Sequence, residues 1–156
     1  MDEKAIIECI KDFFKSCPYL DELTKIKVDY LDNESKDYNY WSLESIGTPR
    51  ILKKNVIGTK TERQINFVLA TRSFFNPSVD VQNIKNLHIF DKIADWLYES
   101  TKNKNLPILN DGESAISIEA LDSPYLFGTD KTNTLARYQM PCKMIYEKRE
   151  ERNLWV

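Results

Sequence analysis

Two long segments alternate apolar and polar side chains, and they constrain the fold more than any other feature of the sequence. In residues 62–73, one face collects Ile65, Phe67 and Leu69. In residues 136–146, every even position is apolar or amphipathic. A period of two is typical of strands with one buried face. Both segments span at least 11 residues, which is about twice the usual strand length. Such strands must project from a small domain or form a strongly coiled sheet.

The rest of the chain supplies two helices and several shorter strands. Helical periodicity predicts a first helix that ends before Pro18 and has Asp2 as its N-cap. The remaining predicted elements are a helix over 3–17, strands over 25–30 and 39–46 with a turn region at 32–37, a helix over 82–101 and a strand over 114–121. The order helix, strands, helix, strands favours an α+β fold with a mainly antiparallel β-sheet flanked by two principal helices. The length of 156 residues predicts a single domain, 1–156.

Three positions carry more specific expectations. Pro141 cannot donate to a strand ladder, so the strand that contains it is predicted to lie at a sheet edge or to be bulged. Ile116 and Ile118 share a parity and are both predicted to point inward. The helix at 82–101 has an apolar arc wide enough to be covered on two sides. The core is expected to cover one side of this helix. A neighbouring subunit is a candidate to cover the second side, on which Trp96 lies.

Composition favours a folded protein of the cytosol. Hydrophobic residues make up 42% of the chain and aromatic residues 12%, as in globular domains. No apolar run approaches the roughly 18 residues that span a membrane, and the acidic start argues against a signal peptide. Cys9 and Cys17 lie about 12 Å apart along one predicted helix, too far for a disulfide. We therefore expect all three cysteines, including Cys142, to be reduced and structural.

The sequence contains no recognisable catalytic or cofactor motif. Only one histidine, His88, is present, so an ordinary zinc site lacks its ligands. His88 has no partner in a nucleophile motif, and acid pairs such as Glu119 with Asp122 are too common to be informative. We expect no enzyme activity, no metal and no cofactor.

The segment 46–63 is the most basic part of the chain. Between Gly47 and Gln64 there are five bases and one acid. Its ending Gly-Thr-Lys-Thr lacks the glycine spacing and the following helix of a phosphate-binding loop. A solvated hairpin connection and an interface are both consistent with it, and apolar residues between the charges suit a protein interface better than a nucleic-acid groove. The candidate contact residues are Arg50, Ile51, Leu52, Lys53, Lys54, Lys60 and Arg63, together with Trp96 on the second helix.

In order and spacing, several stretches resemble the small minor structural proteins of long-tailed bacteriophages and prophages of Gram-positive bacteria. They are Ile10-Lys11-Asp12-Phe13-Phe14-Lys15-Ser16-Cys17-Pro18, Pro49-Arg50-Ile51-Leu52-Lys53-Lys54 with Gly58, Arg63-Gln64-Ile65-Asn66-Phe67, 83–96, Leu106-Pro107-Ile108-Leu109 and 136–146. Together they cover nearly the whole chain. Within that group the chain is most similar to the tail terminator, or tail completion, proteins, which also occur in phage-tail-like bacteriocins.

The resemblance implies a structural assembly protein. It implies a homo-oligomeric ring, typically of six subunits, that caps the tail tube, ends tube polymerisation and presents the surface for head attachment. The implied partners are the tail tube protein and a head-side connector or neck protein, with the free subunit monomeric. If the ring encloses the DNA path, the bases of segment 46–63 would make non-specific DNA contacts. The implied location is the bacterial cytoplasm during assembly and then the virion or tail-like particle, with no membrane contact.

Two other roles stay open at the sequence level. One is a head-completion or stopper protein on the head side of the same junction. The other is a small host-interaction protein encoded by a prophage. Both are compatible with a small α+β domain, so the partner protein distinguishes them.

Overall fold

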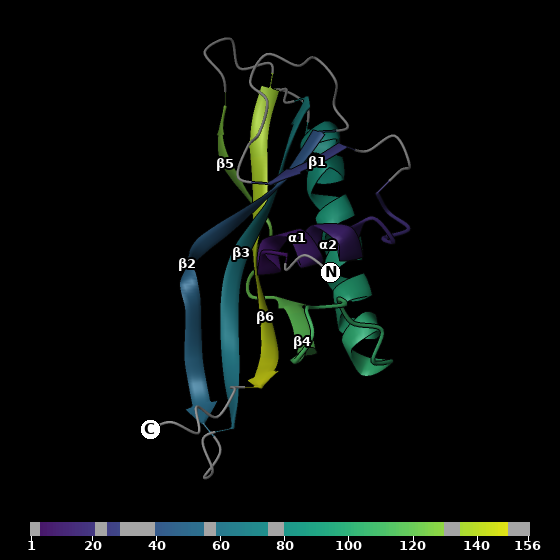
Figure 1. The fold of residues 1–156 in the computed structure, drawn as a ribbon. Helices are drawn as coiled ribbons and strands as arrows, with labels where there is room; N and C mark the ends of the chain where they lie inside the picture. Colours follow the sequence, from purple (N-terminus) through teal and green to yellow (C-terminus); the bar gives the residue numbers. More distant parts are fainter. Residues whose placement is uncertain are drawn as a thin grey trace.

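The computed structural model describes residues 4–20, 25–28, 40–54, 59–74, 80–129 and 135–149. Two helices and six strands lie within these ranges (Figure 1). In chain order they are α1 (Ile6–Phe14), β1 (Lys25–Val28), β2 (Tyr40–Lys54), β3 (Lys60–Phe74), α2 (Asp80–Lys102), β4 (Glu113–Ala120), β5 (Tyr125–Thr129) and β6 (Leu135–Arg149). The predicted turn at 32–37 and the predicted cap Asp2 lie outside the described residues.

The strands form one six-stranded sheet in the order β1-β2-β3-β6-β4, with β5 also paired to β6. Every pairing is antiparallel except that of β1 with β2, which is parallel. The predicted α+β class with a mainly antiparallel sheet is confirmed. β2, β3 and β6 each have 15 residues, so the expectation of unusually long strands is also confirmed. The parallel pairing means that the strands predicted at 25–30 and 39–46 do not form a hairpin.

The predicted edge or bulge at Pro141 is wrong. β6 lies inside the sheet, and its pairing with β3 runs without a break past Pro141, which is opposite Val68. Pro141 has no backbone N–H to donate, and this is tolerated because its nitrogen faces the other side of β6. On that side the pairing with β5 ends at Gln139 and the pairing with β4 ends at Cys142, so no partner strand lies opposite Pro141 among the described residues. The Pro141 carbonyl accepts a 2.8 Å hydrogen bond from the Leu121 N–H. Because both backbone groups of a residue point to the same side of an antiparallel strand, the proline nitrogen faces the bend between β4 and β5.

Both helices pack on the same face of the sheet. The ring of Phe14 in α1 meets Phe67 of β3 edge to face at 6.2 Å, and Phe90 of α2 lies 5.2 Å from Trp41 of β2. The residues of the core face are buried in the middle of β3 and β6 and near the start of β2. A stripe of alternate apolar side chains thus organises each strand, as its period of two predicts.

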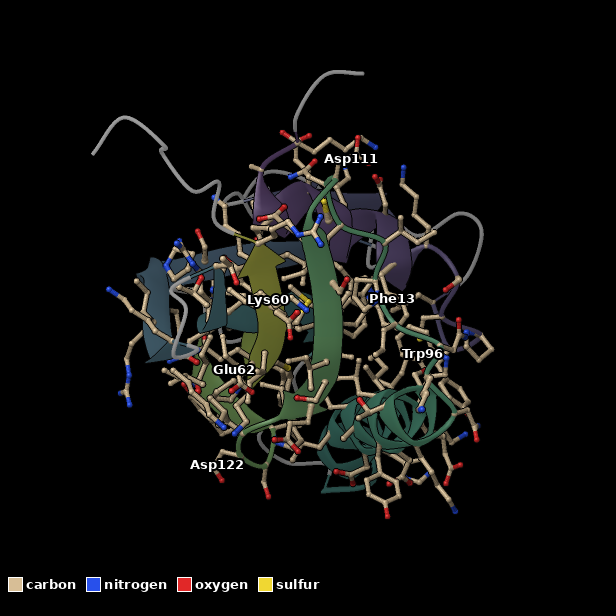
Figure 2. The ribbon with its side chains drawn as sticks, turned by 60° about the horizontal axis from the view of Figure 1, so that its bottom comes forward. Phe13, Lys60, Glu62, Trp96, Asp111 and Asp122 are labelled. Atoms are coloured by element: carbon tan, nitrogen blue, oxygen red, sulfur yellow. The ribbon has the colours of Figure 1, made fainter. Side chains whose placement is uncertain are left out.

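The second covered side of α2 is α1 of the same chain. Trp96 stacks on Phe13 with ring centroids 4.7 Å apart and lies 5.7 Å from Phe14. Figure 2 shows Phe13 and Trp96 together between the two helices. The wide apolar arc of α2 is therefore explained by the sheet and α1, without a neighbouring subunit. Within the described residues, neither helix is long and apolar enough to cross a membrane.

Some local expectations need correction. α1 begins at Ile6, with Ala5 in the N-cap position and no side-chain cap from that residue. Ile118 is buried as predicted, but Ile116 is 43% exposed. The cause is a register shift of β4 on β6 between Ala115 and Ser117, since a bulge rotates the side chain out of the alternation. The short strand β5 was not predicted.

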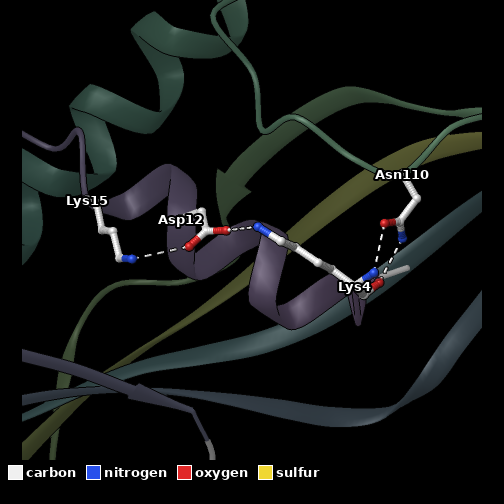
Figure 3. A network of polar contacts seen from close by, with 4 residues as sticks. All are labelled: Lys4, Asp12, Lys15 and Asn110. Carbon is white, nitrogen blue, oxygen red and sulfur yellow. Dashed lines mark hydrogen bonds and ion pairs between the residues drawn. The ribbon is translucent and has the colours of Figure 1, made fainter. Parts of the chain in front are cut away.

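A side-chain clamp replaces the missing cap at the start of α1. The Lys4 N–H donates to Asn110 Oδ1 at 2.9 Å, and Asn110 Nδ2 donates to the Lys4 carbonyl at 2.7 Å (Figure 3). Lys4 also reaches Asp12, whose carboxylate contacts Lys15 as well. The entry to α1 is therefore tied to the connection between α2 and β4.

The outer edge of β4 is closed by a side chain of α2. The Thr101 hydroxyl accepts the Ile118 N–H at 3.0 Å and donates to the Ile118 carbonyl at 2.8 Å. Both backbone groups that an added strand would use at Ile118 are thereby occupied.

Candidate subunit-contact surface

Seven of the eight candidate residues lie on the hairpin-like pair β2 and β3. We use the name basic ribbon for residues 46–54 of β2 together with residues 60–63 of β3, which contain these seven candidates. The segment was expected to be loop-like, but most of it is strand. β2 continues to Lys54, well past the predicted end at residue 46, and residues 55–58 lie outside the described part. Trp96, the eighth candidate, lies apart from the ribbon between the helices.

The bases of the ribbon are divided between the two faces of the sheet. Register places Arg50 opposite Gln64 and Lys53 opposite Glu62, on the face away from the helices. Residues directly opposite each other point to the same face. Ile51 is opposite Arg63, and Lys54 is opposite Thr61, on the face that carries the helices. The sequence places these bases close together, but the fold does not gather them into one basic face.

Acidic side chains of neighbouring strands compensate part of the charge. The Lys60 ammonium lies 3.3 Å from a carboxylate oxygen of Glu147 in β6, and Glu62 is opposite both Glu147 and Lys53. Figure 2 shows Lys60 and Glu62 at the near end of the sheet. Arg63 donates to the Thr61 hydroxyl at 3.0 Å. Among the described residues of the ribbon, the exposed bases that have no acidic residue directly opposite on β3 are Arg50 and Lys54, which pair with Gln64 and Thr61.

Large apolar side chains are exposed on the same part of β2. Ile46 is 51% exposed, Ile51 44% and Leu52 37%. β1 pairs only with the first four residues of β2, 40–43. Among the described residues, 46–54 therefore pair with β3 alone and form an edge of the sheet. Bulges interrupt this edge after Ile46 and after Ile51, and Gly47 supplies the positive φ of +69° at the first of them.

A second exposed apolar surface was missed from the sequence. Residues 116–126, at the end of β4 and the start of β5, form what we call the β4–β5 patch. Its exposed apolar members are Ile116, Leu121, Tyr125 and Leu126. Its charged residues are Glu119 and Asp122, both exposed. Periodicity could not have found this patch, because a bulge turns Ile116 outward and β5 is too short to show a pattern.

A polar network covers part of the sheet face opposite the helices. Arg137 of β6 donates to Glu44 of β2 at 2.7 Å across the intervening strand β3. Its Nε donates to Gln139 at 3.1 Å, and Gln139 in turn donates to the Tyr125 hydroxyl at 2.5 Å. On β3, Ala70 lies between the position opposite Glu44 and the position opposite Arg137. Its small side chain leaves room for Arg137 to reach across. The network links both edge regions of the sheet.

The groups considered for chemistry are distributed without a common centre. His88 is exposed on α2. Glu119 contacts Lys143 at 3.2 Å, and Glu113 accepts from Asn110 at 2.9 Å at the other end of β4. Within the described ranges, no group of three or more histidine, cysteine or acidic residues could hold a metal ion. The three cysteines are buried and free, as expected.

Comparison with known proteins adds no assignment. No protein-family model matches the sequence, and no curated protein matches it with significant similarity.

Proposed function

We propose that this chain is a tail terminator of a long-tailed phage or a phage-tail-like particle. Subunits form a ring that caps the tail tube, ends its polymerisation and presents the surface for head attachment. The proposal combines the resemblance of the sequence with an α+β domain that carries long strands. The observation that carries it is the edge of β2, where exposed apolar residues and bases lie together along strand residues 46–54.

An edge of this kind suits reversible contact between proteins. Monomeric proteins usually blunt a sheet edge with charge, and exposed apolar residues beside that charge favour a protein partner. Ile51 and Leu52 would supply buried area in the contact, while Arg50 and Lys53 would steer the approach. The bulges limit continuous strand pairing, so the contact would rest mainly on side chains.

The arrangement of charge favours a protein partner over DNA for this edge. The bases lie on two faces, and Glu62 and Glu147 alternate with Lys53 and Lys60 on one of them. A backbone of phosphates is best met by a row of bases on one face. Contact of the ribbon with DNA would be weak and non-specific.

Termination then follows from an asymmetric ring. One face of the ring matches the last ring of the tube, and the other face does not, so growth stops there. Contacts between subunits that are weak in solution and strengthened on the tube would keep the free protein monomeric. The head-side connector would bind the outer face.

The test is imaging of particles made without this protein. We expect tube tops of irregular length and tails without heads. Tails of normal length that lack only head attachment would indicate a stopper protein. Normal, joined particles would refute both roles and favour a host-interaction protein. Co-purification separates the first two, because a terminator binds tube protein and a stopper binds a head-side protein.

Charge reversal on the ribbon tests the residues. Arg50→Glu, Lys53→Glu and Lys54→Glu together should leave the fold intact, because all three side chains are exposed, but should abolish capping in a complementation assay. Lys60 is kept because it contacts Glu147. The matched control is Lys102→Glu with Lys104→Glu, two exposed bases away from the ribbon. Normal capping by the triple variant would show that the ribbon is not the contact.

A further inference from the structure

We propose that the basic ribbon of one copy docks on the β4–β5 patch of the next copy, which joins the subunits head to tail. The inference rests on the proposed ring function and identifies the second surface of the contact. It also predicts the type of symmetry, since a contact between two different surfaces closes into a ring or continues as a filament.

The two surfaces lie on opposite edges of the same sheet. β2 precedes β3 and β6 in the strand order, and β4 and β5 pair with the far side of β6. The ribbon and the patch therefore belong to different sides of the molecule. A subunit can contact one neighbour through each of them at once, as a ring requires.

Most of the large exposed apolar residues of the described protein lie on these two surfaces. The ribbon has three of the large exposed apolar residues and the patch has four, seven of the ten in the described part of the chain. The remaining three are Tyr19, Tyr98 and Ile108. Exposure of either apolar surface to water is unfavourable, and contact between the two surfaces would remove both from solvent.

The charges of the two surfaces are complementary. The exposed bases Arg50, Lys53 and Lys54 lie on the ribbon. Residues 116–126 contain Glu119 and Asp122 and no base. Lys143 neutralises part of the Glu119 charge at 3.2 Å, while Asp122 lies in the bend beyond β4. Pairing ribbon with patch brings opposite charges together, whereas pairing two ribbons would bring like charges together, so a two-fold contact is disfavoured.

The mode of contact is also restricted. Thr101 occupies the backbone groups of Ile118 on the outer edge of β4. A ribbon cannot add to β4 as a further strand at that point. The contact is therefore formed by the side chains of both surfaces, with Leu52 exposed on the ribbon and Leu121 exposed on the patch.

Disulfide trapping tests the pairing of surfaces directly. A chain with Leu52→Cys and Leu121→Cys, oxidised at high concentration or on tube ends, should give a ladder of covalent oligomers. A mixture of the two single variants should stop at dimers, and each single variant alone should stay monomeric. The three native cysteines are buried and serve as an internal control. Ile51→Cys and Ile116→Cys provide a second pair if either first variant fails to fold.

Charge reversal provides an independent measurement. Lys53→Glu with Lys54→Glu, or Glu119→Lys with Asp122→Lys, should each weaken self-association by about tenfold or more. A mixture of these two variants should recover it, because each then presents the charge that the other lacks. Asp91→Lys with Asp95→Lys on the exposed face of α2 is the matched control and should have no effect.

The outcomes separate this contact from the proposed function. Dimers of the Leu52→Cys variant alone, or no recovery in the charge mixture, would overturn the head-to-tail pairing even if tube ends are still capped. A covalent ladder from a protein that never caps a tube would refute the terminator role and retain the contact.

Discussion

At the scale of single residues, Asp12 holds two cations at the start of the fold. Its carboxylate lies 2.9 Å from Lys4 and 3.4 Å from Lys15 (Figure 3). The hydrogen bond from Lys4 is the main reason that the pKa of Asp12 lies below its ordinary value of 3.8. The same bond raises the pKa of Lys4 above 10.5. The charge pair helps to hold the uncapped first turn of α1 in place.

The pH dependence of this pair has a defined sign. A lowered carboxyl pKa contributes stability above 3.8 that is lost as the pH falls through the lower folded value. A raised ammonium pKa contributes below 10.5 and is lost as the pH rises through the higher value. Asp12→Asn should therefore lower stability between these limits, and the difference should vanish in acid. Urea unfolding of both proteins across pH measures it, and a difference independent of pH would contradict it. The effect should be small, because both side chains are about half exposed.

Burial dominates the behaviour of Cys142. Its thiol sits in the middle of β6, and burial raises the pKa of this thiol far above its ordinary value of 9.0. Because the thiolate is the reactive form, we expect Cys142 to react with a thiol reagent only as fast as the protein opens. An introduced Leu52→Cys thiol on the exposed ribbon should react at once. Rapid modification of Cys142 in the folded protein, followed by mass spectrometry of peptides, would show that β6 is accessible.

At the scale of elements, the edge formed by residues 46–54 of β2 differs from the edge formed by β4. Thr101 closes β4 at Ile118, whereas residues 46–54 of β2 pair only with β3 within the described chain. Among the described residues, 46–54 of β2 therefore offer backbone as well as side chains to a partner, whereas β4 is blocked at Ile118. The bulges and the bases of β2 are devices that restrain uncontrolled strand addition.

Removal of the Thr101 hydroxyl tests how much its two hydrogen bonds to Ile118 stabilise the protein. Thr101→Val keeps the shape but leaves the N–H and carbonyl of Ile118 without their partner. Loss of both bonds should cost about 1–3 kcal/mol in the free energy of unfolding. Thr101→Ser keeps the hydroxyl and should cost clearly less. Chemical denaturation measures both variants, and a smaller loss in Thr101→Val than in Thr101→Ser would show that the methyl group, not the hydroxyl, matters.

The elements differ in how well their sequence reveals them. β3, α2 and β6 follow from periodicity because each buries a continuous stripe against the core. The second half of β2 does not, since Gly47, Pro49 and two bulges interrupt its alternation. Pro141 favours an edge strand, but β6 lies inside the sheet. The side of Pro141 that lacks a donor faces the bend between β4 and β5, and the sequence around Pro141 does not reveal this neighbour. The acid that neutralises Lys60 is likewise distant in sequence.

At the scale of the whole molecule, two helices and one sheet face form a single core. Trp96 joins the two helices, because it contacts Phe13 and Phe14 of α1 from its place on α2. Such a residue couples elements that are otherwise far apart in sequence. The opposite face of the sheet and its two edges carry the remaining features, namely the polar network, the basic ribbon and the β4–β5 patch.

Trp96→Ala should therefore act on stability. We expect a loss of about 3 kcal/mol in the free energy of unfolding, from lost burial and the cavity left behind. Tyr98→Ala is the control, because Tyr98 is 64% exposed, and it should change stability by less than about 0.5 kcal/mol. Thermal or urea unfolding distinguishes the two. Equal effects would mean that Trp96 does not join α1 to α2.

The strand order has a consequence for how the protein is made. β6 lies between β3 and β4 in the sheet, yet it is the last strand among the described residues. During synthesis, β3 and β4 leave the ribosome before the strand that connects them exists. The core cannot close until residues 135–149 have emerged, so folding is late and depends on distant contacts, which are slow to form. A nascent or truncated chain that lacks β6 would keep two strands open, and we expect it to need protection by chaperones.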